Sequence, residues 1–187
     1  MTGLRRPDPE GYDAWLACVR DFGAGPRDGS GDWQVPGFGP DRASFDALLD
    51  IAATEADRSR PVPQGHVHCD YYWVVEGPDT IGFLAVRHSL DNEFLRTLGG
   101  HIGYSIRPSH RRSGHATAAL GLALDRAREL GLDRVLVTCD DDNVGSARTI
   151  ERHGGVLEGL REGKRRYWIA LDAPWGTPGT AATSHSP

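Results

Sequence analysis

The chain has 187 residues, a formal net charge of −5 and a pI near 5.9. This length suits one domain with a sizeable core, and the acidic balance argues against a general nucleic-acid binder. No apolar run is long enough to span a membrane, and the N-terminus lacks the apolar stretch of a secretory signal. Three cysteines stand far apart without a C-x-x-C motif, which suits a reduced compartment. We therefore expect a cytoplasmic protein that binds neither nucleic acid nor membrane.

Two amphipathic helices are expected in the first third of the chain. Residues 8–22 and 42–56 each place apolar side chains three or four positions apart, which puts them on one face of a helix. The segment between them, residues 23–40, is rich in Gly and Pro and is typical of a loop.

A hairpin and a third strand should follow. Residues 71–75 and 81–86 are rich in β-forming side chains and flank a Gly-Pro-Asp-Thr turn. Residues 90–100 are expected to be irregular or briefly helical. Residues 101–106 indicate a strand, which ends before Pro108.

The second half begins with the best helix pattern, at residues 116–130, where apolar positions recur every three or four residues. An apolar strand is expected at residues 134–139, and Asn143 can cap a short helix after it. Two further strands should form the last pair, at residues 156–160 and 165–171.

This order of elements predicts one α+β domain over residues 1–172, in which a sheet carries helices on its faces. Residues 173–187 are rich in Pro, Gly, Ser and Thr and are expected to form a disordered tail.

Residues 105–117, S-I-R-P-S-H-R-R-S-G-H-A-T, place five basic side chains at one point of an acidic chain. A helix start offers backbone N–H groups without partners and a positive potential, and Gly114 lets a ligand approach the backbone. The stretch could therefore hold a pyrophosphate, helped by the neighbouring arginines. A solvated basic turn before a surface helix is the alternative. It stays open because the sequence contains neither G-x-x-x-x-G-K-[ST] nor G-x-G-x-x-G after a strand, the two longer phosphate-binding motifs.

The motif R-R-S-G-H-A at residues 111–116 resembles the [QR]-x-x-G-x-[GA] motif of the GNAT (N-acetyltransferase) superfamily. It follows a strand ending in I-R-P, as in that family. Downstream, N-V-G-S at residues 143–146 and G-G at 154–155 resemble the family's N-x-x-[AS] and G-[FG]. The resemblance implies a central mixed, mostly antiparallel sheet flanked by helices on both faces, with a short first strand near residues 4–6. It also implies acetyl-CoA as co-substrate and acetyl transfer to a primary amine.

The resemblance further implies a cofactor site. Backbone N–H groups of residues 112–117 would hold the pyrophosphate, and the strand before them would pair edge-on with the pantetheine arm. The Tyr104 amide would polarise the thioester carbonyl. Asn143 would bind the pantetheine, although a plain helix cap explains it equally well. The implied cofactor contacts are Tyr104, Ser105, Ile106, Arg111, Arg112, Ser113, Gly114, His115, Ala116, Thr117, Asn143 and Ser146.

The catalytic residues depart from the family pattern. Three positions where many members carry an acid or a base hold Ile150, Gly100 and Thr138, which cannot do that work. His101 titrates near neutrality and could replace the base, and Tyr104 could be the acid. His101 and Tyr104 are therefore candidates for the base and the acid. A non-catalytic acyl-CoA-binding regulatory module is the alternative function.

The acceptor should be bound by the segment after the strand at residues 81–86, through His88, Asn92 and Glu93. For each of these the alternative is an exposed loop residue. The acceptor could be a small amine, an aminoglycoside-like antibiotic or a protein amino group. The resemblance also allows a homodimer.

Two further groups of side chains could carry chemistry, the histidines before residue 70 and Cys139. His66 and His68 could hold a metal together with Asp70, but no second ligand cluster stands elsewhere, so edge-strand polarity is preferred and no metal is expected. Cys139 could carry an acyl group, but no adjacent His or acid supports this, so a buried inert thiol and direct attack in a ternary complex are preferred.

Overall fold

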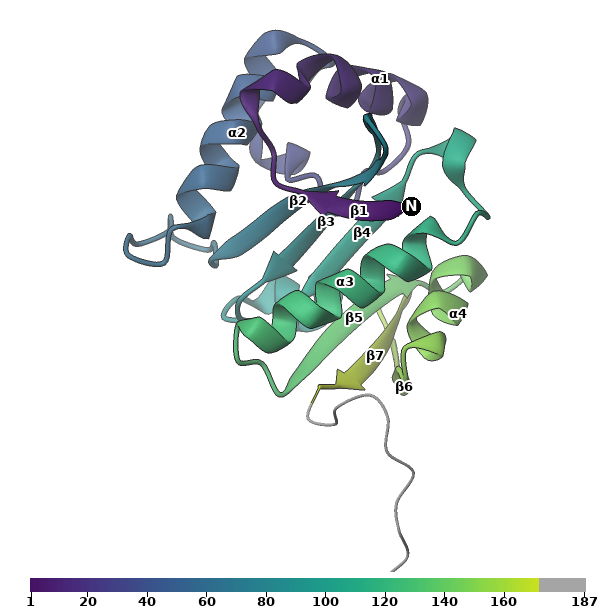
Figure 1. Cartoon of the computed structure of the whole chain (residues 1–187). Coiled ribbons are helices and arrows are strands. Elements are labelled where there is room, and N and C mark those ends of the chain that lie inside the picture. Colours follow the sequence, from purple (N-terminus) through teal and green to yellow (C-terminus); the bar gives the residue numbers. More distant parts are fainter. Residues whose placement is uncertain (172–187) are drawn as a thin grey trace, which may run out of the picture.

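A computed structural model describes residues 1–171, so the tail predicted at residues 173–187 lies outside the described part. Seven strands form one sheet in the order β1-β2-β3-β4-β5-β7-β6 (Figure 1). Neighbouring strands run antiparallel except β4 and β5, which are parallel. The expected mixed, mostly antiparallel sheet is confirmed.

The elements occupy nearly the ranges that the sequence indicated. In the first half they are β1 Thr2–Arg5, α1 Tyr12–Phe22, α2 Arg42–Ala56, β2 Cys69–Glu76 and β3 Asp79–Arg87. In the second half they are β4 Ile102–Ile106, α3 His115–Glu129, β5 Arg134–Asp140, α4 Val144–Arg152, β6 Val156–Arg161 and β7 Lys164–Ala170. Short helical turns lie at Pro9–Gly11, Asp32–Gln34, Leu95–Gly99 and Pro108–His110. Among the described helices, none combines the length and the hydropathy that a membrane crossing needs.

The two histidines before β2 do not lie in a strand, which corrects the expectation of edge-strand polarity. His66 Nδ1 lies 2.8 Å from Oε1 of Glu55, and His68 Nδ1 lies 3.0 Å from the carbonyl oxygen of Glu55. Both rings thus tie this loop to the end of α2. Across residues 1–171, no three His, Cys, Asp or Glu side chains are grouped so that they could hold a metal ion.

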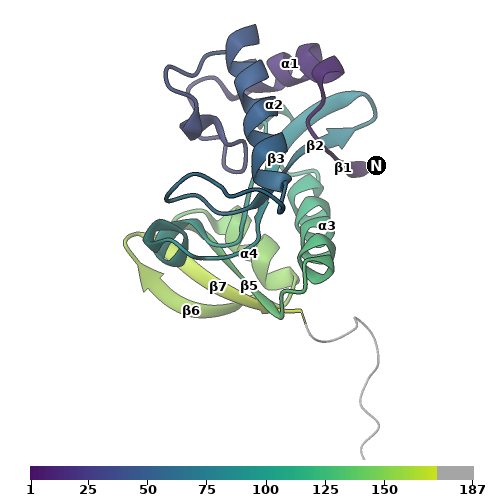
Figure 2. The same ribbon diagram turned by 90° about the vertical axis from the view of Figure 1, so that its left-hand side faces the viewer.

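Helices cover both faces of the sheet, as expected from the resemblance. Helices α1 and α2 lie on one face and α3 and α4 on the other; Figure 2 shows α2 and α3 on opposite sides of the strands. The α1–α2 face has an aromatic core that includes Trp15, Phe22, Phe45, Trp73 and Phe83. The α3–α4 face is largely aliphatic, with Leu84, Ile102, Leu120, Val137 and Ile150. These two cores make the central strands rigid.

Strands β4 and β5 pair at one position only, where Ile102 faces Val137. Strand β4 then continues to Ile106 and β5 to Asp140 without further pairing between them. We call this unpaired stretch, residues 104–106 and 138–140, the β4–β5 fork. It leaves backbone groups without a strand partner in the middle of a sheet, where such groups are normally paired.

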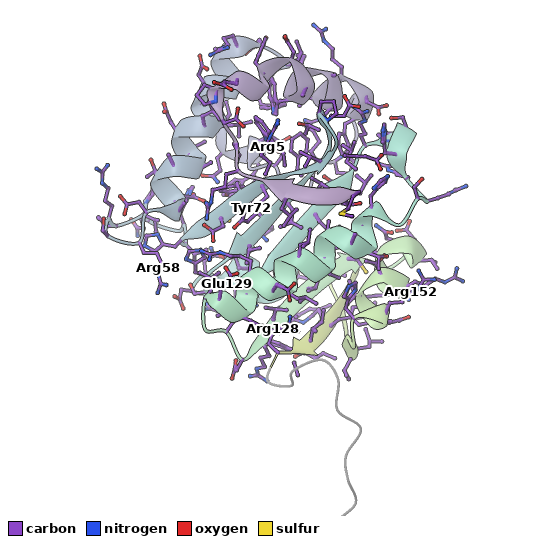
Figure 3. All side chains as sticks on the ribbon, in the orientation of Figure 1. Arg5, Arg58, Tyr72, Arg128, Glu129 and Arg152 are labelled. Carbon is purple, nitrogen blue, oxygen red and sulfur yellow. The ribbon has the colours of Figure 1, made fainter. Side chains whose placement is uncertain are left out.

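A buried carboxylate joins β2 to α3 at the far end of the sheet. Asp70 is 1% exposed; its Oδ1 lies 2.9 Å from Nη2 of Arg6, and its Oδ2 lies 2.8 Å from Nε of Arg126. His88 Nε2 lies 3.3 Å from Oδ2. Burial alone would raise the pKa of Asp70, but the adjacent His88 ring and hydrogen bonds from Arg126 and Arg6 hold it well below its ordinary value. Outer neighbours of this cluster, labelled in Figure 3, are Tyr72 and Glu129.

Replacing this carboxylate should destabilise the fold. Asp70→Asn leaves Arg6 and Arg126 without their anion, and because both are partly exposed we expect a loss of about 2 kcal/mol, below the range for fully buried pairs. A lowered pKa stabilises the fold above the unfolded value of about 3.9, and that contribution fades as the pH falls further. The difference between wild type and variant in urea unfolding should therefore shrink in acid. Asp125→Asn, on the exposed side of α3, should change stability by less than about 0.5 kcal/mol; equal effects of the two changes would contradict the anchoring role.

Candidate functional site

The hydrogen-bond register of β4 decides which of its amides face the fork. Phe83 pairs with Ser105 and Ala85 with Gly103, and the bond from the Arg107 amide to the Ile81 carbonyl fixes the phase of the ladder. In an antiparallel pair, hydrogen-bonded and non-hydrogen-bonded positions alternate. Gly103 and Ser105 therefore direct their N–H and C=O groups to β3.

The intervening residues, Tyr104 and Ile106, direct theirs to the fork. The Ile106 carbonyl accepts a hydrogen bond from Nε of Arg111 at 2.9 Å. The Tyr104 amide is left aimed at the fork, where the sequence placed an oxyanion donor. The expectation that Ser105 pairs with the pantetheine needs correction. Its amide is directed to β3, and its hydroxyl donates to the Asp28 carbonyl on the α1–α2 face.

The segment between β4 and α3, residues 107–114, which we call the basic loop, lies at the open end of the fork. Arg112 and Gly114 have positive φ values, 65° and 82°, and Gly114 is the N-cap of α3. Their backbone conformation turns the chain so that the first helical N–H groups, which have no intrahelical partner, face outward. The side chains of Arg111, Arg112 and Ser113 are exposed, so cationic groups surround these amides.

His115 contributes only its amide here. Its ring is buried, with Nδ1 2.9 Å from Oγ1 of Thr2 and Nε2 3.6 Å from a carboxylate oxygen of Glu76. The ring thus points toward β1 and β2. Ala116 and Thr117 occupy the next two positions of the first turn and have no side-chain nitrogen or charge to offer.

The start of α4 approaches β4 from the α3 side. Oδ1 of Asn143 accepts a hydrogen bond from the Ser146 amide at 3.0 Å, so the cap expected from the sequence is present. Tyr104 packs against the core of the α3–α4 face, and its buried hydroxyl has no hydrogen-bond partner among the described residues. Burial raises the pKa of Tyr104 to about 12, against the opposing effect of Ser146. The phenol therefore stays protonated at neutral pH and can donate a proton.

His101 is placed where it cannot readily act as a base. The ring is buried, and its Nδ1 accepts a hydrogen bond from the Leu136 amide at 2.9 Å. Burial lowers the pKa of His101 to about 4, and the positive charges of Arg87 and Arg134 act in the same direction. The neutral ring thus holds β4 against β5 just before their single paired position. This environment opposes the base role suggested by the sequence.

The expected acceptor residues do not form one pocket. His88 turns to Asp70, on the α3 face. Asn92 caps the turn that follows it, accepting from the Leu95 amide at 2.7 Å, and Glu93 accepts from the Thr97 hydroxyl at 3.1 Å. Because β3 and β4 are antiparallel, this segment adjoins the start of β4, whereas the fork opens at the end of that strand. The structure therefore gives each of the three side chains a local partner and does not bring them together.

Sequence reasoning missed Asp28, which lies beside the fork on the α1–α2 face. The loop at residues 23–40 is rich in Gly and Pro and contains two aspartates, Asp28 and Asp32, and nothing local in the sequence singles out Asp28. Its position follows from long-range contacts, chiefly the hydrogen bond from Ser105 to its carbonyl oxygen, across 77 residues of sequence.

The pH dependence of stability tests the neutral state of His101. Unfolded histidine binds a proton below about pH 6.5, whereas folded His101 does so only near pH 4. Stability should thus fall on acidification through this window by about 1.4 kcal/mol per pH unit from this group, or about 3 kcal/mol in total. In His101→Gln, whose amide oxygen can still accept from Leu136, urea unfolding at pH 4.5 to 7 should show that slope removed. An unchanged slope would show that His101 titrates normally in the folded protein.

Comparison with known proteins agrees with this architecture. Uncharacterized N-acetyltransferase YjdG of Bacillus subtilis (strain 168) is 33% identical over 70 residues, which are 36% of this chain and 40% of that relative. The match thus spans less than half of the relative's length.

Three solved structures share the fold at low sequence identity. Mycobacterium smegmatis RimJ in complex with CoA-disulfide has a TM-score of 0.67 and 20% identity over 91% of this chain and 82% of its own. RimL, a ribosomal alpha-N-protein acetyltransferase in complex with coenzyme A, has a TM-score of 0.66 and 19% identity, covering 92% and 96%. The microcin self-immunity acetyltransferase MccE, in complex with acetyl-CoA and AMP, has a TM-score of 0.63 and 14% identity, covering 90% and 92%.

A family model described as "Acetyltransferase (GNAT) domain" matches residues 4–156, which include the fork, the basic loop and the α3 and α4 helices. With this match over most of its length, the chain belongs to the GNAT acetyltransferase family.

Proposed function

We propose that the protein is an N-acetyltransferase that moves an acetyl group from acetyl-CoA to a primary amine. The observation that carries this proposal is the fork with the basic loop at its open end. A diphosphate at the start of α3 would direct the rest of its molecule into the fork, where the Tyr104 amide has no strand partner. The bound ligands of RimL, RimJ and MccE, coenzyme A or acetyl-CoA, support this assignment.

Coenzyme A would be held mainly by backbone groups. The amides of residues 112–117 would bind the pyrophosphate, with Arg111 and Arg112 adding positive charge. The pantetheine arm would run along β4 as an extra strand and meet the Tyr104 amide. Asn143 and Ser146 at the start of α4 would contact the same arm.

Tyr104 would serve the reaction twice. Its amide would stabilise the oxyanion that forms when the amine attacks the thioester carbonyl, because an N–H fixed in place costs no reorganisation during the reaction. Its protonated hydroxyl, on the α3–α4 face, would donate a proton to the departing thiolate. This replaces the acid that many family members place at the position of Ile150, which is fully buried here.

Direct attack in a ternary complex is the preferred route. The alternative acyl-enzyme would need Cys139 as a thiolate, but burial raises the pKa of Cys139 to about 11. A thiol in that state is a poor nucleophile at neutral pH.

The proposal is tested by thermal shift and thiol release. Acetyl-CoA should raise the melting temperature, and an acceptor panel should then release free coenzyme A thiol. The panel should contain a polyamine, an aminoglycoside and a peptide with a free N-terminus. A melting shift without thiol release from any amine would favour the regulatory module instead, and no shift at millimolar acetyl-CoA would contradict the cofactor site.

A substitution at the start of α3 tests where the diphosphate binds. Gly114→Glu places a negative charge at the proposed phosphate site and should abolish the acetyl-CoA melting shift. Gly131→Glu is the matched control, because Gly131 has φ 80° against 82° for Gly114, lies just past the other end of the same helix, and a side chain at either position meets no atom within 4 Å. Both variants carry the same left-handed strain of about 1–2 kcal/mol, so loss of the shift in both would refute the placement.

A further inference from the structure

The loop between α1 and α2 is fixed against the central strands beside the fork. Gly29 has φ +87°, and a side chain on it would meet Leu84 Cα at 2.8 Å and the carbonyl oxygen of Gly103. The Ser105 hydroxyl donates a hydrogen bond to the Asp28 carbonyl at 2.9 Å. The loop backbone therefore touches β3 and β4, and Asp28 is held next to the strand whose other edge forms the fork.

Arg27 makes this loop rigid and does not neutralise its neighbour Asp28. Its Nε lies 2.7 Å from Oδ2 of Asp32, and its Nη1 donates to the carbonyl oxygens of Gly23 and Gly25 at 2.9 and 3.2 Å. The guanidinium is thus committed within the loop.

The carboxylate of Asp28 has no cationic partner in the described part of the chain. Within residues 1–171, no lysine, arginine or histidine nitrogen lies within 4.0 Å of it. The nearby Lys164 is bound to Asp140 at 2.5 Å, and Arg87 donates to two backbone carbonyls just before β4 at 3.2 Å each. The cations around Asp28 are therefore engaged elsewhere.

Asp32 and Asp140, the two carboxylates that act on Asp28, differ from it in this respect, because Asp32 is paired with Arg27 and Asp140 with Lys164.

The electrostatic surroundings of Asp28 suit a proton acceptor. Burial raises the pKa of Asp28 above its ordinary value; the charge of Lys164 opposes the rise and that of Asp140 adds to it, with smaller effects of Arg87 and Asp32. The residue as a whole is exposed, so its carboxylate is accessible to an incoming ligand.

We propose that Asp28 binds the ammonium group of the acceptor and takes its proton. Its negative charge selects a cationic primary amine over a neutral acceptor. This inference rests on the proposed acetyl transfer and supplies the base that His101 and the positions of Gly100 and Thr138 do not provide. The base then approaches the fork from the α1–α2 face, and the Tyr104 hydroxyl lies on the α3–α4 face.

The proton and electron balance is complete without another reactant. The ammonium gives one proton to Asp28, and the neutral nitrogen bonds to the thioester carbonyl carbon, whose oxygen becomes an oxyanion at the Tyr104 amide. The oxyanion collapses, the carbon–sulfur bond breaks and the thiolate receives a proton from the Tyr104 hydroxyl. The second proton lost by the amide nitrogen returns to Tyr104, and Asp28 releases its proton to solvent. The products are the acetamide, free coenzyme A and one proton.

Asp28→Asn tests this role, using the panel amine that gives the fastest thiol release. The contact with Ser105 uses the backbone of residue 28, so the fold and the acetyl-CoA melting shift should persist. We expect kcat/KM to fall 10²- to 10⁴-fold and the acidic limb of its pH profile to disappear. Asp50→Asn, an exposed carboxylate on α2, should leave both at wild-type values. A kcat/KM within threefold of wild type in Asp28→Asn would overturn the inference. The proposed function is tested separately, by thiol release from the wild-type protein.

Lys164→Gln gives a second, independent readout. Lys164 lowers the pKa of Asp28, and it also neutralises Asp140, whose charge raises that pKa. Its removal should therefore move the acidic limb of kcat/KM to higher pH. An unmoved limb, or a shift to lower pH, would overturn the assignment of Asp28 even if the Asn variant were too unstable to assay.

Discussion

Along β4, every second residue turns its N–H and C=O toward β3, and the residues between turn theirs toward β5. Because β5 pairs with β4 only at Ile102, the backbone of Tyr104 has no neighbouring strand to bond. A ligand with an extended chain of amide groups can form hydrogen bonds with the Tyr104 backbone. Because that backbone is already fixed in a strand, binding costs little conformational entropy. The interruption of one parallel strand pair thus determines where the cofactor can lie. The basic loop at the end of the fork determines that the diphosphate of the cofactor lies at that end.

The surroundings of the fork separate the roles of its charges. Asp32 and Asp140, the carboxylates that act on Asp28, are paired with Arg27 and Lys164, so they do not compete with it for a cationic acceptor. The protonated phenol of Tyr104 lies on the side of the long helix α3. Asp28 lies on the aromatic side, where an acceptor can approach. Proton donor and proton acceptor are thereby kept on opposite faces of one strand, which prevents them from neutralising each other directly.

Much of the fold could be predicted because its signals are local. The spacing of apolar residues predicted the three longest helices, the Asn143 cap predicted α4, and Gly and Pro predicted the main turns. The basic loop could be recognised because its positive charges and Gly114 lie close together in sequence.

The acceptor side could not be predicted in this way. His88, Asn92 and Glu93 follow a strand, as many functional residues do, but antiparallel pairing carries them to the end of β4 away from the fork. His101 has a suitable ordinary pKa, yet the Leu136 amide occupies its lone pair, a contact that only the tertiary structure reveals. Asp28 acquires its position through Ser105, which is distant in the chain.

The close approach of Gly29 to β3 and β4 also limits how this loop can vary. A larger residue there would lift the loop from the strands and move its carboxylate with it. In the outer part of the same loop, Phe38 packs against the aromatic core and Gln34 donates to the Tyr71 hydroxyl, but Trp33, Pro36, Gly37 and Pro40 are exposed and bear no such constraint. Substitutions at these four positions would change the surface that an acceptor meets and leave the proton-transfer geometry intact. Selectivity and reactivity can therefore evolve separately within a single connection between two helices.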